Sequence, residues 1–237
     1  MKIKHSILFI YLLLTGTITI SAQTDSIAFK PSGRIIARAF LDYSTGFNNE
    51  TNGSGFDLTR AFLGYNYRIT PTLQAQVIID AASGKTSQDG LEVYVRNAFL
   101  RWVDKGFDIS IGEIGMLEFS MQEDYWNHRY VLKSFQDLNK MSSSVDLGIT
   151  AGYTFNSFLA ADITLVNGEG YKEVKKDNSN RYGLGITAKP YAGFVLRAFA
   201  DIYNESEEMR AALPEAVTDA TYKNQYSTAL FAGYEDK

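Results

Sequence analysis

The feature that most constrains this chain is an alternation of apolar and polar residues that recurs in ten separate segments. In the first segment, residues 33–43, every second residue is apolar, and arginine or aspartate fills several of the positions between them. Successive side chains of a β-strand point to opposite faces, so a period of two predicts strands with one apolar and one polar face. The ten expected strands cover residues 33–43, 56–69, 72–81, 91–103, 107–115, 145–153, 159–165, 181–188, 194–202 and 225–234.

The connections between these segments alternate in length. This feature distinguishes a barrel from other antiparallel sheets better than the alternation of apolar and polar faces does. Any antiparallel sheet with one solvent-exposed face shows a two-residue periodicity of polar and apolar side chains. The long connections are residues 44–55, 82–90, 116–142, 167–180 and 204–222, and the short ones are 70–71, 104–105, 154–157 and 189–191. Outer-membrane barrels have short turns at one end and long loops at the other, whereas a β-sandwich gives no reason for strict alternation. The expected fold is therefore all-β, an antiparallel transmembrane β-barrel.

Aromatic residues favour the same fold, because several stand at or near strand ends on the apolar face. They are Tyr43, Tyr65, Tyr67, Trp102, Tyr153, Tyr182 and Tyr234. Amphipathic rings are stable at the two interfaces of a membrane, where barrels carry aromatic girdles. The alternative is the ordinary preference of Tyr and Trp for strands.

The first residues have the composition of an export signal. Two lysines precede an apolar stretch from Ser6 to Ile20, and small residues follow it. This order predicts a signal peptide, residues 1–22, that is cleaved after Ala22; the alternative is an uncleaved anchor. We expect residues 23–32 to be a periplasmic segment and residues 33–237 to form the barrel, and we expect the protein in the cell outer membrane.

In such a barrel the polar face lines a lumen, and arginine recurs on that face. The expected pore-lining residues are Arg34, Arg38, Arg60, Arg68, Arg101, Arg181 and Arg197. Basic rings favour anions in a water-filled passage. Aspartates accompany these arginines, so the alternative is a set of Arg–Asp contacts across the wall that contribute little beyond order.

The connection from Met116 to Ser142 differs from the rest because it shows helical rather than alternating spacing. Ser120 with Glu123 three residues later has the form of a capping box, which predicts a helix of about four turns. We expect this segment to fold into the bore, where Phe40 and Phe62 would form a bed for the helix. An outer loop with one solvated helix is the alternative. The expected constriction residues are Tyr125, Trp126, His128, Arg129, Lys133 and Lys140.

Three of those residues, Arg129, Lys133 and Lys140, fall near one face of the expected helix. If the segment lies in the bore, this basic stripe would set a preference for anions. If the segment lies outside, the stripe is a solvated face, which is the usual meaning of such a run.

Four short stretches resemble the phosphate-selective porin O/P-type family in the form common in Bacteroidetes-like envelopes. They are Ser21-Ala22-Gln23 at the end of the signal, Gly33-Arg34, the stretch YWNHRY at residues 125–130 and the stretch NGEGYK at residues 167–172. The resemblance implies a homotrimer of barrels, typically of sixteen strands, with a constricting third loop. It also implies membrane lipid and small hydrophilic solutes or anions as partners. The third loop carries no lysine-rich cluster that would select phosphate.

The sequence supplies ten expected strands and ends on Glu235-Asp236-Lys237, without a terminal aromatic residue. We therefore expect the N-terminal part of a longer porin. A complete barrel of ten strands is the alternative, because barrels with an even number of strands close.

Rival functions have less support in the sequence. An enzyme in a small outer-membrane barrel would need a nucleophile and a base, and His128 beside Asp124 is the lone candidate outside the signal. A secreted β-sandwich that binds glycans is the other rival. The chain has no cysteine, which excludes thiolate chemistry. It has no phosphate-binding loop, metal-ligand cluster or basic tract, so we expect no cofactor and no nucleic-acid partner. The sequence favours a passive diffusion channel without covalent chemistry.

Overall fold

The computed structural model describes residues 29–44, 54–83, 91–129, 132–139, 141–172, 178–204, 206 and 224–236. Residues 31–237 form one compact unit. The expected signal peptide, most of the expected periplasmic segment and Lys140 lie outside the described residues. No helix within the described ranges is both long and apolar enough to cross a membrane.

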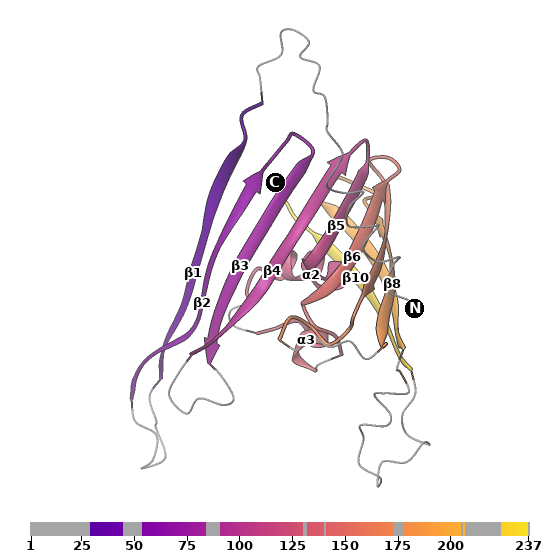
Figure 1. Ribbon diagram of the computed structural model, residues 1–237. Coiled ribbons are helices and arrows are strands. Elements are labelled where there is room, and N and C mark those ends of the chain that lie inside the picture. Colours follow the sequence, from indigo (N-terminus) through magenta and orange to yellow (C-terminus); the bar gives the residue numbers. More distant parts are fainter. Residues whose placement is uncertain are drawn as a thin grey trace, which may run out of the picture. The chain divides into compact units, whose positions relative to one another are not determined.

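Ten strands form one antiparallel sheet, and each pairs with the strand that precedes or follows it in the chain (Figure 1). They are β1 (Ser32–Ser44), β2 (Gly55–Arg68), β3 (Leu73–Ser83), β4 (Leu91–Asp104), β5 (Phe107–Gly115), β6 (Val145–Thr154), β7 (Leu159–Val166), β8 (Asn180–Ala188), β9 (Phe194–Asn204) and β10 (Gln225–Tyr234). The expected all-β fold with ten antiparallel strands is confirmed. The sheet is single, and it is not closed into a barrel, since β1 and β10 do not pair with each other in the described part of the chain.

The expected alternation of connection lengths is also confirmed. The connections β2–β3, β4–β5, β6–β7 and β8–β9 span two to five residues, and each of the other five is longer. Consecutive strands run in opposite directions, so all short turns lie at one end of the sheet. Figure 1 shows turns of this kind at its upper end and the longer connections at its lower end.

The two faces of the sheet carry side chains of opposite character. On β7, Ile163 and Leu165 point outward and are largely exposed, whereas Asp162 and Thr164 point inward. The same alternation governs the other strands, so the outer face is apolar and the inner face is polar. Among the described residues, the buried side chains of Ile114, Met116 and Val166 form a small hydrophobic cluster, which lies inside the curve of the sheet.

A β-bulge on β4 explains an irregularity in the sequence pattern. Arg96 falls on the apolar parity if the strand is regular, but Ile78 pairs with Asn97 and Ile79 with Val95, so Arg96 has no partner on β3. The extra residue shifts the phase by one position. Val93 and Val95 before the bulge and Leu100 after it can therefore share the outer face, although they differ in parity.

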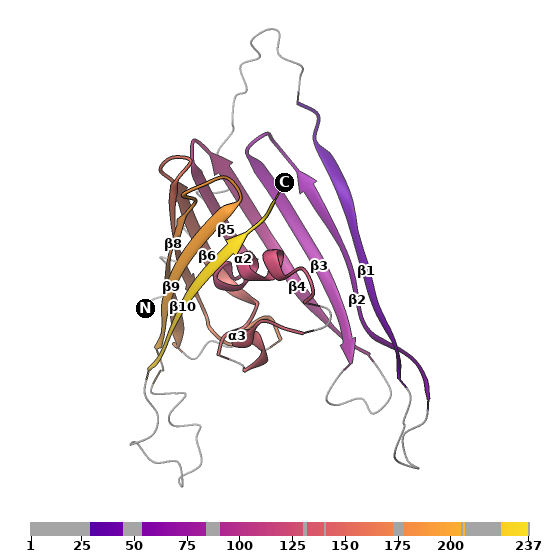
Figure 2. The same cartoon turned by 180° about the vertical axis from the view of Figure 1, so that it is seen from behind.

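The connection between β5 and β6 folds against the concave side of the sheet, as Figures 1 and 2 show. It holds two short helices, α2 (Leu117–Trp126) and α3 (Phe135–Leu138). The expected inward folding is supported by contacts with the far strands, including rings of Tyr125 and Phe231 with centroids 5.4 Å apart. We call residues 116–144 the inserted segment.

The expected capping box and single helix are wrong. Met116 is the N-cap residue, and its N–H donates to Ser144 O, so the helix begins before Ser120. Ser120 lies inside the first turn and its hydroxyl faces Leu117 O. The helix ends where Asn127 takes a left-handed backbone conformation. The contact between Met116 and Ser144 therefore accompanies the start of the helix, whereas its end is set locally at Asn127.

The bulge generates a prediction about two neighbouring deletions. Deleting Arg96 removes the bulge and keeps every other side chain on its face, so we expect a loss of about 1 kcal/mol or less in the free energy of unfolding. Deleting Val95 instead should place Arg96 among the apolar side chains of the outer face and lower the folded yield. Chemical unfolding of both variants measures the difference, and equal stabilities would contradict this assignment of faces.

Candidate functional site

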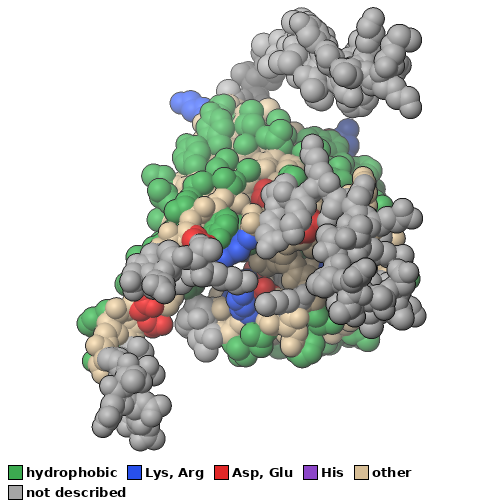
Figure 3. Space-filling view, turned by 60° about the horizontal axis from the view of Figure 1, so that its bottom comes forward, with side chains coloured by type: hydrophobic (Ala, Val, Ile, Leu, Met, Phe, Trp, Pro, Cys, Tyr) green, Lys and Arg blue, Asp and Glu red, His purple; other side chains and the backbone are tan. Residues whose placement is uncertain are grey.

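The inner face of the sheet and the inserted segment line an open cavity of about 1140 Å³. Residues of β1 and β2 lie on one side of it, and residues that follow α2 lie on the other. Figure 3 shows Lys, Arg, Asp and Glu side chains around a hollow, with apolar side chains on the outer surface. Among the expected site residues this cavity brings together Arg38, Arg60, His128, Arg129 and Lys133.

Four of the seven expected pore-lining arginines form ion pairs with aspartates of other strands. The pairs are Arg60–Asp80, Arg101–Asp108, Arg181–Asp201 and Arg197–Asp162. Paired guanidinium groups contribute less net positive charge to the inner face of the sheet than free ones. The alternative reading of these residues, as contacts within the wall, thus holds for these four.

The pair between Arg197 and Asp162 spans two strands because of a glycine between them. Arg197 lies on β9 and Asp162 on β7, and Arg197 Nη1 lies 2.6 Å from Asp162 Oδ2. Gly185 of β8 lies below this contact, where a Cβ atom would stand 2.3 Å from Arg197 Nη2. Arg197 also donates to the hydroxyl of Thr187 over 2.9 Å. The absence of a side chain at Gly185 is what allows the bridge.

The pair between Arg60 and Asp80 is completed by a tyrosine from a distant connection. Arg60 Nε donates to Asp80 Oδ1 over 2.9 Å, and Tyr171 Oη lies 2.8 Å from both Arg60 Nη2 and Asp80 Oδ2. Burial raises the pKa of Tyr171 to about 12, so its phenol keeps a proton to donate to Asp80. The guanidinium of Arg96 lies 6.0 Å from the ring centroid of Tyr171 and 5.2 Å from that of Phe62.

Tyr171 reaches this position because the chain after β7 turns back into the interior. The N–H groups of Gly168 and Gly170 donate to Asp146 Oδ2 over 3.0 and 3.2 Å, and both glycines have positive φ. Tyr171 N–H donates to Val145 O. The stretch at residues 167–172, read from sequence only as part of a family resemblance, is therefore a second segment on the inner face. The glycine pair with an intervening acid was the available signal for a tight turn.

The other three expected pore-lining arginines are more open. Arg34 and Arg38 lie on the edge strand β1, are exposed, and form no ion pair with a described residue. Arg38 lines the large cavity. Arg68 ends β2 at the side of the short turns and is exposed. Among the described residues, positive charge without an ion pair therefore lies at Arg34 and Arg38 of β1 and at Arg96 of β4.

The expected constriction residues surround the end of α2, but they do not form a basic helical stripe. Arg129 and Lys133 lie in the connection between the two helices. Arg129 donates to Glu123 Oε1 over 2.6 Å and also pairs with Asp137, and Lys133 Nζ lies 3.7 Å from Asp137 Oδ1. The expected stripe is therefore wrong for these two residues, and their charges are largely neutralised.

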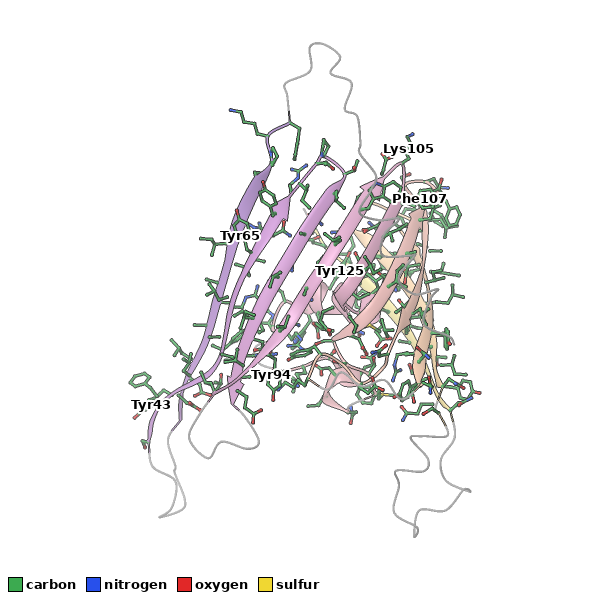
Figure 4. All side chains as sticks on the ribbon, in the orientation of Figure 1. Tyr43, Tyr65, Tyr94, Lys105, Phe107 and Tyr125 are labelled. Atoms are coloured by element: carbon green, nitrogen blue, oxygen red, sulfur yellow. The ribbon has the colours of Figure 1, made fainter. Side chains whose placement is uncertain are left out.

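The aromatic constriction residues divide between two sides of the inserted segment. Tyr125 lies inside the sheet in Figure 4 and packs on Phe231 of β10. Trp126 is half-exposed, and its indole N–H donates to Leu132 O over 3.3 Å. His128 Nδ1 lies 2.6 Å from Trp126 O. This contact turns the ring toward the backbone of α2.

The expected bed of Phe40 and Phe62 is wrong. These two rings pack edge to face on each other with centroids 5.6 Å apart, and Arg60 lies over Phe62 at 4.7 Å. They line the large cavity that separates them from the inserted segment. The rings that support the segment are Phe231 under Tyr125 and Phe199 beside α3. The alternation of apolar and polar residues does not indicate which strands face the helices.

The arrangement as a whole is polar, and most of its described ion pairs join groups of the inner face or of the inserted segment. Burial raises the pKa of Asp124, which lines the large cavity near the end of α2. The described residues contain no group of three His, Asp or Glu side chains placed to hold a metal ion. Chemically, such a cavity can solvate polar and charged molecules.

Comparison with known proteins adds no family. No model of a known protein family matches the sequence, and no curated protein matches it. The resemblance drawn from the residues of this chain stays a prediction.

Two of the ion pairs provide a matched test of the inner wall. The carboxylate of Asp80 is fully buried, whereas Arg101 and Asp108 are each 41% exposed. Asp80→Ala should therefore lower the free energy of unfolding by about 3 kcal/mol or more, because Arg60 and Tyr171 lose their shared partner. Asp108→Ala should cost about 1 kcal/mol or less. Chemical unfolding measures both, and similar costs would contradict the buried network.

Proposed function

We propose that this protein is a passive diffusion channel of the cell outer membrane for small hydrophilic solutes. The observation that carries the proposal is the outer face of the sheet, where large apolar side chains are exposed on adjacent strands from β1 to β10. Apolar patches of this extent are not stable in water and mark a surface that contacts another apolar phase. Lipid is the phase that fits a face this continuous.

Other features of the sheet agree with a membrane wall. The strands have 8 to 14 residues, and a tilted strand needs about 9–11 to cross the hydrocarbon layer. Tyr43 and Phe107 project outward at opposite ends of the sheet in Figure 4, as aromatic girdles would. The short turns at one end and longer connections at the other also have the asymmetry of outer-membrane barrels.

We extend the proposal to a closed barrel. The edges of β1 and β10 leave backbone N–H and C=O groups unpaired in the described part of the chain, and such groups are costly in lipid. Further strands that complete a barrel of about sixteen would satisfy them, as in the family that the sequence resembles. In that family the barrels are trimers and the third loop narrows the pore, the role we propose here for the inserted segment.

The charges on the inner face support a modest preference for anions rather than a dedicated phosphate site. Arg34, Arg38 and Arg96 are not ion-paired to a described carboxylate. Arg129 and Lys133 of the inserted segment are paired with Glu123 and Asp137, so these two residues offer little free charge to a phosphate. Positive groups without partners favour anions in a water-filled passage.

Conductance measurements test the channel directly. The purified full chain added to a planar phospholipid bilayer should produce stepwise increases in current, and a salt gradient should give a reversal potential that indicates anions over cations. Alkaline carbonate should leave the protein with the membrane fraction. Recovery of the folded protein in the soluble fraction, without conductance steps, would overturn the proposal and favour a secreted binding protein.

Two adjacent positions on β3 distinguish a lipid-facing surface from a water-facing one. Val77 points outward and Gln76 points inward. Val77→Lys should lower the free energy of unfolding in lipid vesicles by about 2–4 kcal/mol, because the charge enters the hydrocarbon layer. Gln76→Lys should cost much less and increase the preference for anions. An outer face in contact with water predicts instead almost no cost for Val77→Lys.

The proposed closure can be measured because the chain contains no cysteine. Spin labels at Ile35→Cys on β1 and Leu230→Cys on β10 report the separation of the two edges. Adjacent strands lie about 5 Å apart. We expect a separation several times larger, as further strands between the edges require. A separation equal to that of paired strands would show that these ten strands close by themselves. That outcome would contradict the larger barrel but not the proposed channel function.

A further inference from the structure

Glu118 is a buried acid at the place where the inserted segment meets the wall. It lies in the first turn of α2 and is only 6% exposed. The strands closest to it are β8, β9 and β10, at the far end of the sheet from the large cavity's arginines. None of the ion pairs described above includes it.

The charged groups that face Glu118 form an ion pair with each other. Arg181 of β8 donates to Asp201 Oδ1 over 2.7 Å and to Met141 O over 3.1 Å. Asp201 of β9 also accepts a hydrogen bond from Ser227 of β10. The described residues that α3 and β10 present to the same place are uncharged. Arg181 and Asp201 are therefore the charges that a carboxylate at Glu118 would experience.

Both carboxyl oxygens of Glu118 are buried and accept no well-aligned hydrogen bond from the described residues. Its nearest polar neighbours are the hydroxyl of Ser142 and the carboxyl group of Asp201, and both act on its pKa. Glu118 and Ser142 line a cavity of about 60 Å³, and the Ser142 hydroxyl is buried without a well-aligned hydrogen bond to a described residue. A cavity of this size has room for a few water molecules. The site thus places a buried acid and a buried hydroxyl beside space for water, at one contact between segment and wall.

A negative charge on Glu118 in this place would lack a counter-ion. The single guanidinium nearby already neutralises Asp201, and a buried ion without a partner is strongly unfavourable. The start of α2 favours a negative charge, but that effect is weaker than the cost of burial. Burial raises the pKa of Glu118 to about 8, with Asp201 acting in the same direction. The uncharged acid is therefore the form that suits the docked segment at neutral pH.

We propose that Glu118 is a proton-binding site that fastens the inserted segment to β8–β10, and that loss of this proton releases the segment from the wall. The inference concerns only the docking of the segment and holds whether or not solutes cross the bore. If the proposed channel is correct, release of the segment also changes the width of the bore.

The direction of the pH dependence follows from proton linkage. The pKa of Glu118 is about 8 when the segment is docked and close to the ordinary 4.5 when it is released into water. The docked state thus holds its proton more tightly. The equilibrium constant for docking of the segment is largest below pH 4.5. It falls by at most about tenfold for each pH unit between 4.5 and 8, and it is smallest above pH 8.

Hydrogen exchange on the purified full chain tests the proposal. The readout is the protection factor of the α2 amides between pH 5 and 9, corrected for the intrinsic exchange rate, with the amides of β6 as an internal reference. We expect protection of α2 to fall as the pH rises while that of β6 stays constant. Protection of α2 that does not depend on pH would overturn the proposal.

Two variants separate loss of the proton site from simple destabilisation. Glu118→Gln keeps the shape without the charge, so α2 should stay protected at pH 9. Asp201→Asn frees Arg181 to neutralise an ionised Glu118, so the fall in protection should become smaller than in the wild type.

The matched control is Asp124→Asn on the same helix, which should retain the wild-type profile. A pH-dependent loss of protection that persists in Glu118→Gln would assign the titration to another group and overturn the proposal. Loss of α2 protection at every pH in Glu118→Gln would also overturn it, because the neutral side chain should dock.

Discussion

The structure depends on one constraint: a sheet with an apolar outer face must accommodate nearly all of its charge on the inner face. Charged groups that are partly removed from water need partners, so the inner wall pairs arginines with aspartates across strands. Arg181 and Asp201, with side chains 3% and 0% exposed, are the most buried example. The pairs fix the side chains around the cavity, and they leave free charge at only a few places.

The same constraint explains why the two inward segments lie where they do. The turn at residues 167–172 is held by the carboxylate of Asp146 and delivers Tyr171 to Arg60 and Asp80. The inserted segment brings its own acids, Glu123 and Asp137, to neutralise Arg129. Each segment thus enters a polar space by satisfying polar groups. Glu118 departs from this rule, since neither of its buried carboxyl oxygens accepts a well-aligned hydrogen bond from a described residue.

Strand positions, the two faces and the alternation of connections could be read from sequence because they are local properties. A period of two needs only neighbouring residues, and connection lengths follow once the strands are placed. The phase shift at Arg96 could not be derived in this way, because a bulge is defined by the pairing of β4 with β3. The start of α2 at Leu117 is likewise set by the contact between Met116 and Ser144, 28 positions apart.

The candidate site was less accessible to sequence than the fold. Seven arginines were expected on the polar face, and four of them form ion pairs with aspartates of other strands. Which aspartate each one meets depends on register and on small residues such as Gly185, which lets Arg197 reach Asp162. Arg129 and Lys133 of the inserted segment do not form the expected basic stripe, because Glu123 and Asp137 pair with them. A count of charged residues along the sequence therefore overestimates the unpaired charge on the inner face.

Every strand pairing in the described chain joins strands that are consecutive in sequence. A sheet of this kind is a row of hairpins, and a hairpin can be added or removed at either edge without changing any existing pairing. The circumference of such a wall can therefore change in steps of two strands during evolution. Contacts that cross the interior resist such a change, for example the packing of Tyr125 on Phe231 of β10. These contacts fix the distance between strands that do not pair with each other, and the strand pairings alone do not fix that distance.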